Sequence, residues 1–222
     1  MNIFKPSHGI AFDIDGIILD TATHIWEGVN RHFGLNRHIN EWTQYDIETI
    51  VDKSIDELRP IYEPILAKND MPMVNGAKQA LQWLHAQFPE EALLFITARR
   101  LQFKDAAINS LKRELGPGIP FKVICTMERH TEHRSIKLEI LKEHEITFFI
   151  DDNPRYWKTY LDAGIKIGTL AWPWTKDEFH KDIYKNTDLI IFYSWEEVLY
   201  HFKEMGLSWM DRHKSVISRS IK

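Results

Sequence analysis

The segment from Gly9 to Asp20 constrains the fold of this chain more than any other feature. Its sequence is Gly-Ile-Ala-Phe-Asp-Ile-Asp-Gly-Ile-Ile-Leu-Asp, so a short apolar run ends in Asp13 and Asp15 and is followed by Gly16. In an extended strand, residues i and i+2 point to the same side, so both carboxylates can face one site. The apolar run predicts a buried strand of a parallel sheet, and ligands of such sheets bind at the carboxyl ends of the strands. Two carboxylates at that point suit a hard cation together with a phosphate.

Short apolar runs, separated by stretches with helical spacing, predict the order of elements along the chain. The predicted strands are Ile10–Phe12, Leu93–Ile96, Phe121–Cys125, Thr147–Ile150, Ile165–Leu170 and Leu189–Phe192. The predicted helices are Gly76–Phe88, with Asn75 as its N-cap, Phe103–Leu115 and Ile136–His144. Strands that alternate with helices form parallel βαβ units. The predicted fold class is therefore α/β, with a Rossmann-like parallel sheet and helices on both faces.

The stretch from Asp20 to Met73 breaks this alternation, because it contains no convincing strand and is much longer than a crossover needs. Helices are expected at Thr21–Phe33, Trp42–Ile50 and Ser54–Ala67, with Pro60 and Pro64 interrupting the last. Asp20 could hold the loop below these helices or cap the first of them. We predict a small helical cap at residues 21–73, inserted after the first strand into an α/β core made of residues 1–20 and 74–222.

Composition and charge exclude several classes of protein. Of the 222 residues, 44% are hydrophobic and 27% are charged, which is ordinary for a globular protein that buries a substantial core. A net charge of −4 gives no global basic field, so a stable nucleic-acid partner is not expected. There is no apolar signal region at the N-terminus and no run long enough to span a bilayer. No membrane partner and a cytoplasmic location are therefore expected.

Further polar residues follow predicted strands or open a predicted helix. They are Thr97 at the end of Leu-Leu-Phe-Ile-Thr, Lys137 at the start of a helical stretch, and Asp151 and Asp152 after Thr-Phe-Phe-Ile. An aspartate pair, a threonine, a lysine and a second aspartate pair stand in the order typical of the haloacid dehalogenase superfamily of phosphatases. The chain resembles that superfamily from about residue 9 to residue 202, and helical caps after the first strand are common there.

This resemblance implies a catalytic role for each motif. Asp13 would be the nucleophile that forms an aspartyl-phosphate, which splits one hard step into two easier ones. Asp15 would protonate the leaving oxygen and later accept a proton from water. Relatives that dehalogenate or pump ions lack this acid, so Asp15 favours phosphomonoester chemistry. Thr97 would bind the transferred phosphoryl group and Lys137 would neutralise its oxygens. The alternatives are acids in a solvated turn, a strand threonine and a surface lysine, with Arg134 in place of Lys137.

Magnesium is the cofactor that the resemblance implies. The residues expected around it are Asp13, Asp15, Asp151 and Asp152, with the backbone carbonyl of Ile14. Magnesium keeps several of its waters in proteins and therefore needs few carboxylates. One of the two acids at 151 and 152 could instead cap a helix that begins at Asn153-Pro154.

Substrate contacts are expected from the loops that follow the second and fifth strands. The expected substrate-binding residues are Thr97, Ala98, Arg99, Lys137, Trp172 and Trp174. Arg99 and Arg100 could alternatively be solvated arginines at a helix start. The two tryptophans of Trp172-Pro-Trp174 could stack on a base, and the alternative is packing of the cap against the core.

The small cap and the order of motifs up to Trp195-Glu-Glu resemble the 5′(3′)-deoxyribonucleotidase branch and its bacterial relatives, although Thr97-Ala-Arg departs from the Thr-Ser-Pro type of animal enzymes. We predict a magnesium-dependent phosphomonoesterase that acts through an aspartyl-phosphate, like a 5′-nucleotidase, on nucleotides or similar small phosphorylated metabolites. A polynucleotide-end phosphatase and a non-catalytic phosphate-binding regulatory module are the alternatives. The expected partner is a small phosphorylated substrate, and the sequence leaves a homodimer open.

Overall fold

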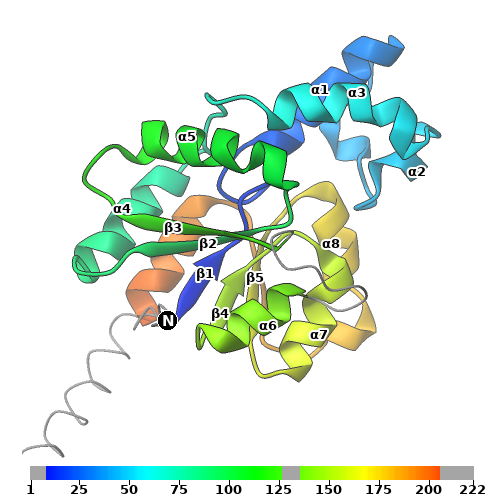
Figure 1. The fold of residues 1–222 in the computed structure, drawn as a ribbon. Coiled ribbons are helices and arrows are strands. Elements are labelled where there is room, and N and C mark those ends of the chain that lie inside the picture. Colours follow the sequence, from blue (N-terminus) through cyan, green and yellow to red (C-terminus); the bar gives the residue numbers. More distant parts are fainter. Residues whose placement is uncertain (1–8, 127–135, 206–222) are drawn as a thin grey trace, which may run out of the picture.

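The computed structural model describes residues 9–126 and 136–205, and it is built on a six-stranded parallel sheet (Figure 1). The order of the strands is β3-β2-β1-β4-β5-β6. Their bounds are β1 (Ile10–Phe12), β2 (Leu93–Thr97), β3 (Phe121–Cys125), β4 (Phe148–Ile150), β5 (Lys166–Leu170) and β6 (Leu189–Phe192). Each lies where an apolar run predicted it, so the predicted α/β class is confirmed. Arg134, the alternative to Lys137, lies outside the described residues.

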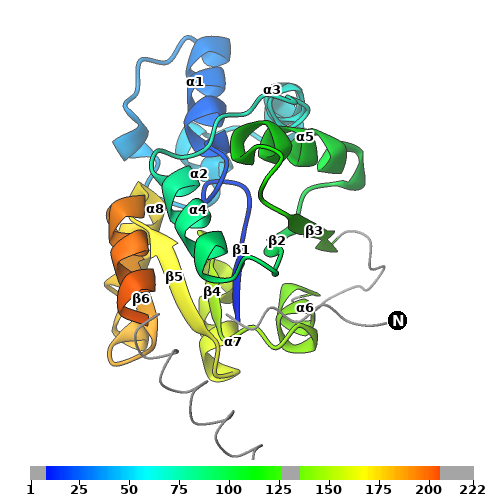
Figure 2. The same cartoon turned by 90° about the vertical axis from the view of Figure 1, so that its left-hand side faces the viewer.

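Helices cover both faces of this sheet, as expected for continuous apolar strands (Figures 1 and 2). One face carries α4 (Ala77–Gln87), α5 (Lys104–Leu115) and a helix over residues 195–205, and the other carries α6 (Ile136–Glu143) and α7 (Trp157–Asp162). The side chains of β1 alternate between the two: Ile10 and Phe12 belong to the first core cluster, and Ala11 belongs to the second. Strand β1 is therefore buried on both sides, and only its end is free to form a site.

The core helices follow their predicted bounds closely, but the start of α4 differs. Gly76 rather than Asn75 is its N-cap residue, with φ of 84° and no capping side chain. A Cβ on Gly76 would lie 2.8 Å from the Cβ of Trp195, so only glycine allows the helix over residues 195–205 to come this close. Helices α7, α8 (Pro173–Phe179) and the helix over residues 195–205 were not predicted, although in α8 a proline at the first helical position signals a helix start.

Three helices stand at the carboxyl edge of the sheet and are called the cap helices below (Figure 2). They are α1 (Thr21–Phe33), α2 (Ile47–Val51) and α3 (Ile55–Leu66). Helix α1 has the predicted bounds, and the Asp20 side chain caps it by accepting a hydrogen bond from the Thr23 N–H at 3.3 Å. Helix α2 begins later than predicted, since residues 42–46 are not helical and follow a short 3-10 turn (Ile39–Glu41).

The prediction that Pro60 and Pro64 interrupt the third cap helix was wrong, since α3 runs through both. The two prolines stand four positions apart on the exposed side of α3, while Leu58, Ile61 and Ile65 are buried. The carbonyl groups that lose their helical partners therefore face water, which reduces the cost of each proline. A capping box between Ser54 and Glu57 also stabilises the first turn of α3.

Two adjacent backbone segments connect the cap helices to the core. The Asp20 N–H donates to the Pro72 carbonyl, and the Val74 N–H donates to the Ile18 carbonyl, each at 2.9 Å. These bonds form a short antiparallel pair at the point where the chain leaves the core and returns to it. In the part of the chain that the structure describes, no helix combines the length and the apolar character needed to cross a membrane.

Candidate active site

Three predicted site residues meet where β1 and β4 end side by side. Asp13 follows β1, Asp151 follows β4, and Lys137 lies in the first turn of α6. The Lys137 Nζ atom is 3.0 Å from Asp13 Oδ2 and 3.1 Å from Asp151 Oδ1. All three side chains are buried. The ammonium group therefore links the two strand ends that the sequence predicted to meet.

The acids beside Lys137 have the arrangement of a cation site. Carboxylate oxygens of Asp13, Asp151 and Asp152 lie within 4.8 Å of one another. Asp13 Oδ1 and Asp151 Oδ2 are buried and have no hydrogen-bond partner among the described residues. Buried carboxylate oxygens are normally paired, so these two fit a hard cation such as Mg²⁺. Asp15, which was also predicted to hold the metal, is not part of this described cluster.

The pKa values of these residues indicate that the cluster holds too little positive charge for its carboxylates. Burial raises the pKa of Asp13 to about 8, because desolvation is the largest effect and exceeds the attraction of Lys137; the charges of Asp151 and Asp15 raise the pKa further. Burial and the same neighbouring carboxylates also raise the pKa of Asp152 well above its usual range. For Lys137, burial opposes the charge, but Asp13 and Asp151 prevail and raise its pKa well above the usual value. A bound cation would supply the positive charge that this cluster lacks.

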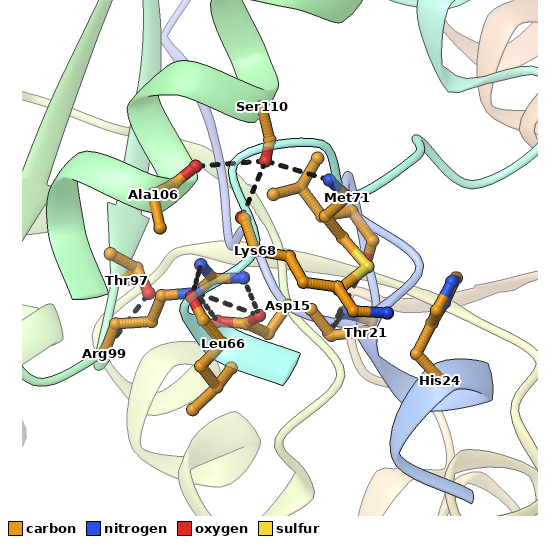
Figure 3. Close-up of polar contacts among 12 residues, drawn as sticks. Asp15, Thr21, His24, Leu66, Lys68, Met71, Thr97, Arg99, Ala106 and Ser110 are labelled. Atoms are coloured by element: carbon orange, nitrogen blue, oxygen red, sulfur yellow. Dashed lines mark hydrogen bonds and ion pairs between the residues drawn. The ribbon is translucent and has the colours of Figure 1, made fainter. Parts of the chain in front are cut away.

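Asp15 points to a different partner, the buried Arg99 (Figure 3). Arg99 Nη2 donates to Asp15 Oδ1 at 2.7 Å and Arg99 Nε donates to Asp15 Oδ2 at 2.9 Å, which makes a bidentate pair. Burial opposes ionisation of Asp15, but the guanidinium prevails and holds the pKa of this carboxyl below its usual value. Arg99 Nη1 also donates to the Leu66 carbonyl at the end of α3, at 3.2 Å. One side chain thus contacts the predicted acid/base residue and a cap helix together.

Thr97 at the end of β2, and Ala98 and Arg100 after it, differ in their surroundings. The Thr97 hydroxyl is buried and accepts a hydrogen bond from the Arg99 N–H at 3.1 Å, so it holds the turn that aims Arg99. Ala98 and Arg99 both line the cavity above Asp13. Arg100 points away: it is half exposed and pairs with Glu63 of α3 at 2.8 Å. The alternative prediction of a solvated arginine therefore fits Arg100 but not Arg99.

Trp172 and Trp174 lie at the site, but their indoles are engaged with the protein. The Trp172 Nε1–H donates to the Gly16 carbonyl at 2.6 Å, and the Trp174 Nε1–H donates to the Asp152 carbonyl at 3.2 Å. Trp174 is buried, stacks on Trp172 and lies 4.6 Å from the Trp42 ring of the cap region. Trp174 lines the cavity, whereas Trp172 is not one of its lining residues. The geometry favours the packing alternative over a wall of two free indoles.

A cavity of about 340 Å³, called the chamber below, lies between these residues and the cap helices. The side of the chamber that the core forms contains Asp13, Asp15, Gly16, Ala98, Arg99, Lys137, Asp152, Asn153 and Trp174. The cap side, formed by the cap helices and the segment before α2, contains Thr21, Ala22, Ile25, Trp42, Tyr45, Asp46, Ile47, Glu48, Ile55, Tyr62 and Leu66. Nothing in the sequence singled out Asp46, Glu48 or Tyr62 as lining residues. No motif marks these three, because only the folded chain brings them to one cavity.

Tyr45 and Asp46 close one side of the chamber by contacting the loop after β4. The Asp46 carboxylate pairs with the Arg155 guanidinium, and Arg155 also lies over the Tyr45 ring, with its Cζ atom 5.4 Å from the centroid. Burial raises the pKa of Tyr45 well above its usual value, and the charges of Asp152 and Asp13 raise it further. The Tyr45 phenol therefore lies beside the acidic cluster, although it belongs to the cap region.

Comparison with known proteins identifies the fold. A crystal structure of a HAD family hydrolase from Deinococcus radiodurans R1, with bound phosphate and sodium, superposes with a TM-score of 0.57 at 15% identity. That match covers 89% of this chain and 96% of the other. This chain has the haloacid dehalogenase (HAD) fold. The "putative HAD-hydrolase YfnB" from Bacillus subtilis, bound to magnesium, has the same HAD fold, with a TM-score of 0.53, 14% identity and coverage of 87% and 96%.

Sequence comparison adds one curated relative of this HAD-fold chain. It is the Bacillus subtilis (strain 168) protein named "Putative nucleotidase YqfW", which is 29% identical over 147 residues, or 65% of this chain and 69% of the relative. No protein-family model matches the chain. The predicted resemblance to HAD phosphatases, and to nucleotidases among them, is thus confirmed.

Proposed function

We propose that this protein is a magnesium-dependent phosphomonoesterase that acts through an aspartyl-phosphate on Asp13. The observation that carries the proposal is the group of Lys137, Asp13 and Asp151, in which one buried ammonium bridges two carboxylates that each keep an unpaired buried oxygen. HAD hydrolases and phosphatases share the fold, and the curated relative is named as a nucleotidase. These similarities support phosphoric monoester hydrolysis.

The residues divide the reaction into two proton-balanced steps. In the first, an Asp13 oxygen attacks phosphorus, the ester bond breaks, and the leaving oxygen takes a proton from Asp15. In the second, water attacks phosphorus, Asp15 accepts its proton, and the bond to Asp13 breaks. Arg99 favours the ionised form of Asp15, which is the form that the second step needs. An arriving phosphate dianion adds negative charge nearby and so favours the protonated form for the first step.

Asp13, Asp151 and Asp152 would hold the magnesium ion. When bound, it would screen the repulsion between the Asp13 carboxylate and the phosphate. Lys137 neutralises phosphoryl oxygens from the side and fixes Asp13. The Ala98 and Arg99 backbone, held by the Thr97 hydroxyl, lies at the edge of the same site.

We further propose that residues 21–73 act as the cap and that the substrate is a nucleotide or a similarly small phosphorylated metabolite. The chamber is of the size that binds small molecules, and its cap side is rich in apolar and aromatic groups. The similarity to a protein named as a nucleotidase favours nucleotides within that class. The cytoplasmic location, the absence of a stable nucleic-acid partner and the homodimer stay predictions.

Turnover of p-nitrophenyl phosphate and of a panel of nucleoside 5′-monophosphates and sugar phosphates tests this function. We expect hydrolysis that needs Mg²⁺ and stops in excess chelator. Asp13→Asn should reduce turnover by more than about a hundredfold, because an amide is a poor nucleophile. The matched control is Asp105→Asn, the same change at an exposed position of α5. Full activity in chelator would contradict the metal assignment, and near-normal activity of Asp13→Asn would contradict the nucleophile.

A further inference from the structure

We propose that the chamber selects phosphate esters whose leaving group carries no negative charge, and that Glu48 is the residue that sets this preference. The inference rests on the proposed phosphatase function and names the substrate class for that site. It favours nucleoside monophosphates and amino-alcohol phosphates. It disfavours bisphosphates, nucleoside di- and triphosphates, and phosphate esters of hydroxy acids.

The first argument is the placement of cations. Among the described residues that line the chamber, the cationic side chains are Lys137 and Arg99. Both lie on the phosphate side, and both are already bound to carboxylates, Lys137 to Asp13 and Asp151 and Arg99 to Asp15. No described cation of the cap helices lines the chamber. A second anionic group on the substrate would find no positive charge there.

The second argument is the placement of anions. Asp46 and Glu48, at the start of α2, line the cap side of the chamber. The negative charge of Asp46 is offset by its ion pair with Arg155. Glu48 is half-buried, and within the described part of the chain no cation pairs with it. Its carboxylate therefore supplies the uncompensated charge on the side where a leaving group would lie.

Tyr62 adds a hydrogen-bond donor to the cap side of the chamber, which Glu48 also lines. The Tyr62 ring belongs to α3 and lines the same cavity. Burial raises the pKa of Tyr62, and the charges of Glu48 and then Asp46 raise it further. The cap side of the chamber therefore offers a phenol donor and a carboxylate acceptor beside apolar side chains such as Ile25, Ile47 and the exposed Ile55. Such a surface suits an apolar or aromatic leaving group that donates hydrogen bonds through hydroxyl or amino groups.

Three aryl esters provide the test: phenyl phosphate, 4-carboxyphenyl phosphate and 4-(aminomethyl)phenyl phosphate. Their leaving groups carry a neutral, a negative and a positive substituent. For the wild type we expect kcat/KM to fall in the order positive, neutral, negative. In Glu48→Gln, the negative-to-neutral ratio of kcat/KM should rise about tenfold and the positive-to-neutral ratio should fall by a similar factor, as expected for charges a few ångströms apart in a partly buried site.

The matched control is Glu27→Gln, which makes the same change on the exposed side of α1. It should leave all three ratios unchanged, which separates a local effect from the loss of one net charge. Ratios that are the same in Glu48→Gln and the wild type would overturn the inference while leaving the phosphatase function in place. Absence of turnover of phenyl phosphate would instead contradict the proposed function.

Binding tests the inference independently of turnover. Dissociation constants of the same three esters can be measured by calorimetry on the Asp13→Asn protein with magnesium, with and without Glu48→Gln. The order of affinities should follow the charge of the substituent and should flatten when Glu48 is neutralised. An order that does not depend on Glu48, or tighter binding of the negative ester by the protein that retains Glu48, would overturn the charge selection.

Discussion

At the scale of single residues, the pairing of Asp15 with Arg99 adds most to what the motifs imply. The two residues stand 84 positions apart in the chain, and Arg99 makes three hydrogen bonds to the Asp15 carboxylate. The same guanidinium reaches Leu66 of α3. We therefore propose that Arg99 is a positioning residue that fixes the orientation of the Asp15 carboxyl group. Its direct neighbour Arg100 has no such role, because it faces solvent and Glu63.

We expect Arg99→Gln to reduce turnover of alkyl phosphates about tenfold more than turnover of p-nitrophenyl phosphate. Alkoxide leaving groups need the Asp15 proton most, and a misplaced acid harms them first. Parallel kinetics on the two substrates, with a thermal melt, measures this. Arg100→Gln is the matched control and should affect neither substrate selectively. If Arg99→Gln lowered both rates by the same factor, Arg99 would be a structural residue and the positioning role would be rejected.

At the scale of elements, the sequence predicted what depends on local pattern. Short apolar runs followed by Asp13, Thr97 and Asp151 marked strand ends, and neighbouring parallel strands bring such ends to one edge. The sequence misjudged α3, because the cost of Pro60 depends on whether the freed carbonyl reaches water, and only the exposed side of the folded helix shows that. The side of α2 that faces the chamber could not be predicted, since only the folded chain brings Glu48 of α2 and Tyr62 of α3 to one cavity.

Helix α8 supplies a further test, because its residue Trp174 contacts both the segment before α2 and the acidic loop after β4. It is buried, contacts Trp42, and donates to the Asp152 carbonyl. We expect Trp174→Ala to lower the unfolding free energy by roughly 3–5 kcal/mol, the usual cost of removing a buried aromatic side chain. Losses of activity on nucleotides and on p-nitrophenyl phosphate should be similar, since the acidic loop itself is disturbed.

Chemical denaturation and kinetics of Trp174→Ala check this expectation, with Tyr200→Ala as the control at an exposed aromatic residue. Trp174→Phe retains most of the packing and removes the hydrogen bond, so it should be less destabilising than Trp174→Ala. A stable Trp174→Ala protein that lost only nucleotide turnover would support base stacking on Trp174 and contradict the packing role.

At the scale of the whole molecule, side chains from two core loops hold the cap helices and the segment before α2. Arg99 and Arg100, after β2, contact α3, and Arg155, after β4, contacts Asp46 and Tyr45. We expect Arg155→Gln to raise KM for nucleotides several-fold while lowering stability by less than about 1 kcal/mol, because exposed ion pairs contribute little to stability. Lys158→Gln, which breaks an exposed pair within α7, should change neither quantity. An unchanged KM in Arg155→Gln would show that this contact does not help to close the chamber.

The stability of the metal-free protein should depend on pH through the acidic cluster. Burial raises the pKa of Asp13 from 3.8 to about 8 in the folded state. The folded protein therefore keeps a proton that the unfolded chain has already lost between these two pH values. The contribution of Asp13 to the free energy of unfolding is fully present below about pH 4. It decreases as the pH rises towards 8, by at most ~1.4 kcal/mol per pH unit.

Magnesium should reverse this loss, since a cation favours the ionised carboxylates that burial disfavours. We expect the increase in melting temperature on addition of Mg²⁺ to be larger at pH 8 than at pH 5. In Asp13→Asn, the metal-free protein should be more stable than the wild type at pH 8, its stability should vary less between pH 5 and 8, and its response to Mg²⁺ should be smaller. Thermal melts of both proteins at each pH, with and without the metal, measure all of these quantities. A magnesium response that is equal at both pH values, or one that Asp13→Asn leaves unchanged, would separate Asp13 from the cation site and remove the electrostatic reason for placing the metal there.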